Sequence, residues 1–105
     1  MIYELRIYYI HPGRMEAIHE RFREHTLGLF AKHNMGVLDF WEDLEENVIY
    51  YTMEHPDKET RDRNFKAFAS DPEWIAVKVE SEKDAPIVEK VESHLMKRVP
   101  YSPLA

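Results

Sequence analysis

The chain has 105 residues, the size of one typical domain, so we expect a single domain over residues 1–105. Its 14 basic and 20 acidic residues give a formal net charge of −6 without a basic stripe, which argues against binding nucleic acid. The lack of cysteine excludes disulfides, thiolate metal sites and cysteine nucleophiles. No apolar run approaches the roughly 20 residues of a membrane span, and the chain opens on a charged strand, so we expect a soluble, cytoplasmic protein.

The first predicted element is a strand over residues 2–9, with the sequence IYELRIYY. Side chains alternate between the two faces of a strand, so Leu5 and Ile7 lie on one face. Glu4 and Arg6 then lie on the other. The strand therefore has one apolar face and one face that carries a charge pair.

A turn with the sequence HPG at residues 11–13 ends this strand. Apolar residues then recur at intervals of three, four and seven, which predicts an amphipathic helix from residue 14 to about residue 33. Two strand-like runs follow at residues 37–43 and 47–53, and the short LEEN loop between them predicts an antiparallel hairpin.

Two helices and a strand complete the predicted order. Asp57 is the expected cap of a helix that ends near residue 70, and Asp71 with Pro72 begins the next helix. The β-branched run over residues 86–99 predicts a last strand. This order is that of an α+β, ferredoxin-like split β-α-β fold, with a four-stranded antiparallel sheet and helices on one face.

Neither face of this sheet is wholly polar, and helices can cover only one of them. We expect Leu5 and Ile7 to face the helices, so that a second copy of the chain covers the face with Glu4 and Arg6 in a two-fold homodimer. In the alternative interpretation, Glu4 and Arg6 form an ordinary solvated ion pair.

Five short motifs are spread over nearly the whole chain: IYELRIY (2–8), HPGRM (11–15), FREHTLGLFAKHNMG (22–36), DPEW (71–74) and RVPYSPL (98–104). In the order and spacing of these motifs, the chain resembles the NIPSNAP family of the dimeric α/β-barrel superfamily. The resemblance implies two ferredoxin-like protomers whose sheets form one barrel. Superfamily relatives include cofactor-independent oxygenases, isomerases and haem enzymes, whereas NIPSNAP domains have no assigned chemistry and some serve as interaction proteins.

By its matching motif positions, the resemblance also selects individual residues. These are Glu4, Arg6, His25, Trp74 and the tail residues Tyr101, Ser102 and Pro103. The chain departs from the family at Gly28, where a proline is common. Glycine loosens a helix without kinking it, so the sequence does not determine the local shape of the helix near His25.

His25 is the first candidate catalytic residue. It falls within the apolar stripe of the first helix, three residues after Phe22 and four before Leu29, so we expect it to point inward. Imidazole is a common general acid or base near neutral pH, and Arg6 is a suitable group to polarise a carbonyl or enolate oxygen. The alternative for His25 is a neutral, hydrogen-bonded core residue.

The charge pair on the first strand can also hold a polar group of a ligand. The candidate ligand-binding residues are Glu4, Tyr8, Trp41, Tyr50 and His94, although core or barrel-lining roles suit most of them equally well. Glu16 and His19 have a di-iron spacing, but no second such pair occurs, so we expect no metal site and no cofactor.

Two functions remain open. One is a cofactor-independent enzyme of oxygenase or isomerase type that acts on a small apolar or carbonyl-containing ligand in a helix–sheet pocket. The other is a non-catalytic ligand-binding or protein-interaction module, and haem binding is a weaker third possibility. A fold shared by so many activities does not choose between them.

Overall fold

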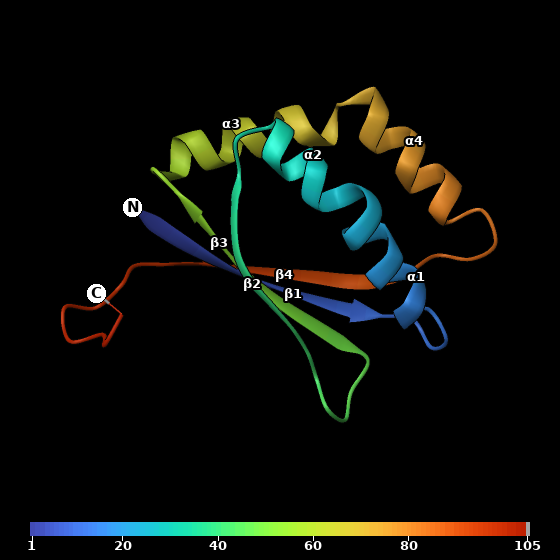
Figure 1. The fold of residues 1–105 in the computed structure, drawn as a ribbon, viewed down its shortest axis with the longest axis horizontal. Coiled ribbons are helices and arrows are strands. Elements are labelled where there is room, and N and C mark those ends of the chain that lie inside the picture. The colour runs from blue at the N-terminus through green and yellow to red at the C-terminus, as the bar shows by residue number, and fades with distance from the viewer. Residues whose placement is uncertain (105) are drawn as a thin grey trace.

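The computed structural model describes residues 1–104 and shows an α+β fold, in which all helices lie on one side of a four-stranded antiparallel sheet (Figure 1). The strands are β1 (Ile2–Ile10), β2 (Gly36–Glu42), β3 (Val48–His55) and β4 (Val88–Met96), in the order β2-β3-β1-β4. The helical segments are α1 (Met15–Arg21), the π-helical turn η1 (Phe22–Thr26), α2 (Leu27–Lys32), α3 (Lys58–Ala69) and α4 (Pro72–Ser81). The predicted element order and fold class are confirmed.

The predicted helix boundaries also hold. The Asp57 side chain accepts a hydrogen bond from the Thr60 amide at 2.7 Å, and Asp71 accepts one from the Glu73 amide at 2.9 Å. Asn34 adopts the left-handed conformation with φ of 59°, which ends the first helical segment, the continuous run of α1, η1 and α2. No helix among residues 1–104 is long and apolar enough to cross a membrane.

An aromatic cluster between the sheet and the helices forms the centre of the core. The Tyr51 ring of β3 lies 5.3 Å from Phe22 and 4.7 Å from Phe40, measured between ring centres. Phe30 of α2 lies 5.0 Å from Phe68 of α3 and 6.2 Å from Tyr51. These rings join both helical segments to the central strands.

The expected orientation of the sheet is wrong. Glu4 and Arg6 face the helices, because Arg61 of α3 donates hydrogen bonds to the Glu4 carboxylate. Leu5 and Ile7 therefore lie on the opposite side, away from every helix. The alternation of the strand was predicted correctly, but alternation alone does not say which face a helix covers.

The side of the sheet without helices is called here the uncovered face. Its centre is apolar or aromatic, and its β4 edge is polar. From the strand register, its residues are Tyr3, Leu5, Ile7 and Tyr9 of β1, Asp39 and Trp41 of β2, Val48, Tyr50, Thr52 and Glu54 of β3, and Lys90, Glu92, His94 and Met96 of β4.

We predict that Phe30→Ala lowers the free energy of unfolding by about 3–5 kcal/mol, because Phe30 is buried among the rings of the core and its truncation leaves a cavity. Urea denaturation followed by circular dichroism measures this loss. Leu44→Ala is the control, since Leu44 is fully exposed and its truncation should cost less than about 0.5 kcal/mol. Equal losses for the two variants would contradict the described core.

Candidate functional site

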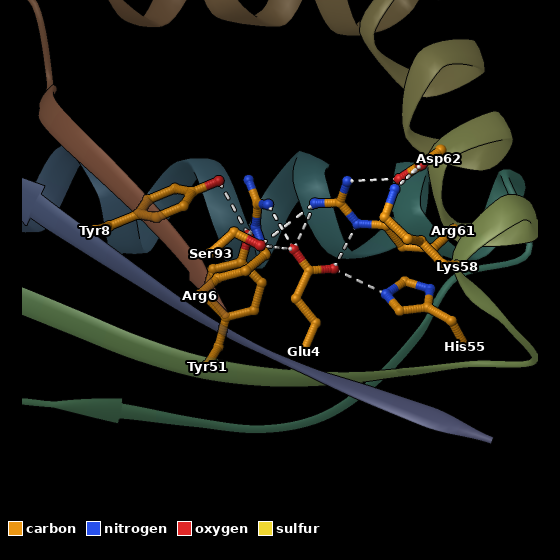
Figure 2. A network of polar contacts seen from close by, with 9 residues as sticks. All are labelled: Glu4, Arg6, Tyr8, Tyr51, His55, Lys58, Arg61, Asp62 and Ser93. Carbon is orange, nitrogen blue, oxygen red and sulfur yellow. Dashed lines mark hydrogen bonds and ion pairs between the residues drawn. The ribbon is translucent and has the colours of Figure 1, made fainter. Parts of the chain in front are cut away.

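A fully buried carboxylate joins three strands and a helix. Glu4 of β1 has no exposed surface, and its Oε2 accepts hydrogen bonds from Arg61 Nη2 at 2.6 Å, Ser93 Oγ at 2.6 Å and Arg6 Nη1 at 2.9 Å. Its Oε1 accepts one from Arg61 Nε at 3.0 Å and lies 2.9 Å from His55 Nε2. Figure 2 shows these side chains converging on Glu4 from β1, β3, β4 and α3.

Glu4 stays ionised at neutral pH. Burial alone would raise the pKa of this carboxyl, but the hydrogen bonds from Arg61, Ser93 and Arg6 outweigh it and lower the pKa from 4.5 to about 2. Two guanidinium groups share this one carboxylate, and Arg61 also bonds to the exposed Asp62 at 3.0 Å. Lys58 also pairs with Asp62 at 2.7 Å, so three cations face two carboxylates and the cluster keeps a net positive charge.

Arg6 continues the network toward two tyrosines. Its Nε donates to the Tyr51 hydroxyl at 2.6 Å, and the Tyr51 hydroxyl donates to that of Tyr8 at 3.0 Å. The Arg6 guanidinium also lies 4.6 Å from the Phe65 ring centre, and only 13% of its side chain is exposed. Within residues 1–104, Nη2 of Arg6 donates to no carboxylate or carbonyl oxygen, and the Tyr8 hydroxyl also bonds to the guanidinium. Figure 2 shows Arg6 and Tyr8 on the same side of β1.

The protonation states of this chain of groups follow from burial and charge. Burial would lower the pKa of Arg6, but the neighbouring Tyr51, Tyr8 and Glu4 raise it, so Arg6 is a permanent cation. Burial raises the pKa of Tyr51 well above its ordinary range, so its phenol stays neutral. The network thus presents a fixed positive charge with the neutral Tyr51 hydroxyl beside it.

The helix layer leaves one strip of the sheet open beside Arg6. Val91 and Leu95 lie on the helix-facing side of β4 with Ser93 between them, because Val91 pairs with Tyr8 and Ser93 with Arg6. Val91 is 44% and Leu95 41% exposed. We call Val91, Ser93 and Leu95 the β4 strip; it is an apolar surface that borders the Arg6 cation.

Three predicted ligand-binding residues lie elsewhere. Trp41 pairs with Tyr50 on the uncovered face, where the Tyr50 hydroxyl donates to Asp43 at 2.8 Å. His94 pairs with Leu5, so it lies on the uncovered face as well. The expectation that His94 joins Glu4 and Arg6 is wrong, since the sheet separates them. Of the predicted ligand-binding set, only Glu4 and Tyr8 lie with Arg6.

The expectation that His25 points inward is also wrong, because its side chain is exposed. A π-helical turn has more residues per turn than an α-helix, so the buried stripe passes from Phe22 to Thr26 instead of to His25. Thr26 Oγ1 donates to the Arg21 carbonyl at 3.2 Å within this turn. His25 instead lines a cavity between η1 and α4, on the outer side of the helix layer.

Sequence reasoning missed four members of the buried network, namely Tyr51, His55, Arg61 and Ser93. One signal was available: a carboxylate on a covered strand needs a cationic partner, and Arg61 lies on the inner side of the next predicted helix. Among the described residues 1–104, no three His, Asp or Glu side chains are placed to hold a metal ion.

The geometry is that of a ferredoxin-like α+β domain with a buried charge network between sheet and helices. The NIPSNAP family profile matches residues 3–103, so the chain belongs to the NIPSNAP family. No curated protein matches the chain.

Solved structures agree with this assignment. A NIPSNAP family protein from Agrobacterium tumefaciens is 20% identical with a TM-score of 0.86, and 99% of this chain and 98% of that chain are covered. An uncharacterized NIPSNAP domain protein from Burkholderia xenovorans is 20% identical with a TM-score of 0.82, at 98% and 99% coverage. An antibiotic biosynthesis monooxygenase is 17% identical with a TM-score of 0.63, at 95% and 100% coverage. At these identities the similarity shows a shared fold.

We predict that Glu4→Gln lowers the free energy of unfolding by about 3 kcal/mol at pH 7, because a shift of the pKa from 4.5 to about 2 corresponds to that stabilisation. The pKa of Glu4 is lowered on folding, so its contribution is complete above pH 4.5 and is lost as the pH falls toward 2. Urea denaturation at pH 7, 4 and 3 should therefore show the gap between wild type and variant closing.

The matched control is Glu89→Gln on the exposed side of β4, which should change stability by less than about 0.5 kcal/mol at each pH. A gap between wild type and Glu4→Gln that stays constant with pH would contradict the ionised state of Glu4.

Proposed function

We propose that this protein is a small-molecule enzyme of the cofactor-independent oxygenase or isomerase type, and that Arg6 binds the oxygen of a carbonyl-containing ligand. The observation that carries the proposal is the state of Arg6: it is a buried cation, fixed by Glu4 and Tyr51, and among residues 1–104 its Nη2 donates to no carboxylate or carbonyl oxygen. A fixed cation of this kind stabilises the negative charge that develops on a carbonyl oxygen when a neighbouring proton is removed.

The surroundings of Arg6 suit an apolar ligand with one such oxygen. The exposed Val91 and Leu95 of the β4 strip offer apolar contacts beside Arg6, and the Tyr8 hydroxyl offers a second polar contact. Isomerisation and oxygenation next to a carbonyl can both begin with an enolate, so one binding geometry serves either reaction. The fold similarity to an antibiotic biosynthesis monooxygenase is consistent with this class of chemistry.

A second candidate function is a binding module without catalysis. It is favoured by the position of His25, which is exposed on the outer side of the helix layer and cannot serve as the base for an oxygen held by Arg6. Tyr51 also stays protonated, since burial raises its pKa. Binding and proton removal therefore need separate measurements.

We predict that the protein binds acetylacetone as its enolate, with the released proton passing to the buffer, and that it catalyses exchange of the central C–H protons with water or buffer as the base. The enolate has its own ultraviolet band, which should grow at constant pH when protein is added, because Arg6 favours the anion over the neutral enol. Deuterium exchange followed by proton NMR measures catalysis. Arg6→Met should abolish both signals, whereas Arg63→Met on the exposed side of α3 should keep them.

The two functions give different results. Growth of the enolate band without catalysed exchange supports the binding module, and loss of the band in Arg6→Met alone assigns binding to this site. If the folded wild type shows no enolate band, both functions proposed for Arg6 are contradicted. If Arg6→Met fails to fold, Arg6→Lys replaces it. Lysine keeps the positive charge but cannot bond Glu4 and Tyr51 simultaneously in the same way, so this variant should bind the enolate at least several-fold more weakly.

We also propose that two copies of the chain form a homodimer through the uncovered face. This face is broad, and Leu5, Ile7 and Tyr50 supply an apolar centre that sheet-on-sheet packing can bury. With the two-fold axis along the strands, β4 of one copy lies opposite β2 of the other. This arrangement replaces the expected dimer through Glu4 and Arg6.

We predict that Ile7→Glu converts the dimer into a monomer, because it places two charges at the centre of an apolar interface. Sedimentation velocity at micromolar concentration measures the mass. Val79→Glu introduces the same charge on the exposed side of α4 and should leave the mass unchanged. A wild-type protein that sediments as a monomer at this concentration would contradict the dimer.

A further inference from the structure

The cavity beside His25 lies between two helices and is separate from the Arg6 site. It has a volume of about 520 Å³ and lies between the α1–η1 segment and α4. Its walls combine Arg14 and Arg21 on one side with Ser81 on the other. None of the residues that line it belongs to the Glu4 network or to the β4 strip.

Two arginines meet at one residue of this cavity. Arg14 Nη2 donates to the Ser81 carbonyl at 2.9 Å and to the Ala85 carbonyl at 3.1 Å. Arg21 Nη1 donates to the Ser81 hydroxyl at 3.3 Å. Two positive charges are therefore held close together, and neutral oxygens are their shortest contacts.

The two guanidinium groups have few direct carboxylate partners. Among residues 1–104, the carboxylate within ion-pair distance of them is Glu82, at 3.4 Å from Arg21 Nη1. Only 5% of the Arg21 side chain is exposed, its guanidinium lies 5.2 Å from the Trp74 ring centre, and burial lowers its pKa. The Nε atoms of Arg14 and Arg21 are both buried without a hydrogen-bond partner among residues 1–104. An anion close to the two guanidinium groups would offset a charge that is costly to bury.

The rest of the lining limits what kind of anion fits. Ala17, Ala76 and Val77 form an apolar wall. Glu20, Glu80 and Asp84 also line the cavity, and Lys83 is paired with Glu80 at 2.7 Å. These carboxylates repel a ligand that carries several negative charges, whereas a ligand with one charge and an apolar body can direct that charge to the arginines.

We propose that this cavity binds an organic carboxylate with a single negative charge, whose carboxylate lies near Arg14 and Arg21 and whose apolar body lies on Ala17, Ala76 and Val77. A planar carboxylate matches the fork of donors that a guanidinium presents. The exposed His25 then lies at the wall of a binding site and not in the core. This site does not depend on the function proposed for Arg6.

The test is a titration of the ¹⁵N-labelled protein with hexanoate, at constant ionic strength, followed by amide chemical shifts. We expect saturable shifts that cluster on residues 76–81 and on α1. Hexanamide, which has the same shape without the charge, and ATP, which carries several charges, should each bind at least about ten-fold more weakly, because each loses or opposes the charge-assisted contact.

Two variants test the site, so the result does not depend on a single substitution. Ala76→Trp fills the cavity from an exposed position of α4, so it should abolish hexanoate binding and leave the thermal unfolding temperature unchanged. Arg21→Met should weaken hexanoate binding about ten-fold or more. Lys78→Met is the control, since Lys78 is exposed on α4 and does not line the cavity.

The proposal is overturned if hexanoate and hexanamide shift the same amides equally, or if Ala76→Trp binds hexanoate as the wild type does. It is also overturned if hexanoate shifts cluster at Arg6 and Tyr8, which would assign the carboxylate to the other site. Acetylacetone binding at Arg6 is measured separately, so failure at one site does not decide the other.

Discussion

The fold depends on the fully buried carboxylate of Glu4. A carboxylate without exposed surface is tolerated only if hydrogen bonds and opposite charge replace the water that it loses. Glu4 meets this requirement with partners from β3, β4 and α3 as well as from its own strand. The same contacts that keep Glu4 ionised therefore fix the distance between helix α3 and the sheet, and they leave no freedom in the position of Arg6.

The two sides of the sheet are consequently specialised. On the helix-facing side, the aromatic core and the charge network lie next to each other, and the network ends at Arg6 beside the open β4 strip. The uncovered face carries apolar and aromatic side chains without a buried charge at its centre. We therefore propose chemistry for the first side and association between copies for the second. This division is the reverse of the one that the strand pattern alone suggests.

Much of the fold was predictable because its signals are local. Asp57 and Asp71 cap their helices, Asn34 ends the first helical segment, and the hairpin between β2 and β3 follows from a short polar loop. The orientation of the sheet was not predictable in this way, because it depends on a contact between Glu4 and Arg61, 57 residues apart in the chain. Charged residues on a strand usually indicate solvent, and only a buried partner reverses that inference.

The position of His25 shows a second limit of sequence patterns. The spacing of Phe22, His25 and Leu29 fits an α-helical stripe, but the π-helical turn changes the angle between successive residues over this segment. The turn ends two residues before Gly28, the position where the chain departs from its family. The exposed His25 thus belongs to the cavity between the helices, and the candidate site on the sheet retains Arg6, Glu4 and Tyr8.

The most direct test of the central claim is a pH titration of the Glu4 side-chain carboxyl carbon, followed by ¹³C NMR in the folded protein. The described network predicts a midpoint near pH 2, which means that the carboxylate stays ionised among its arginines throughout the stable range. A midpoint near 4.5, the ordinary value for glutamate, would show that Glu4 is not held as an anion beneath the helices and would contradict the orientation of the sheet.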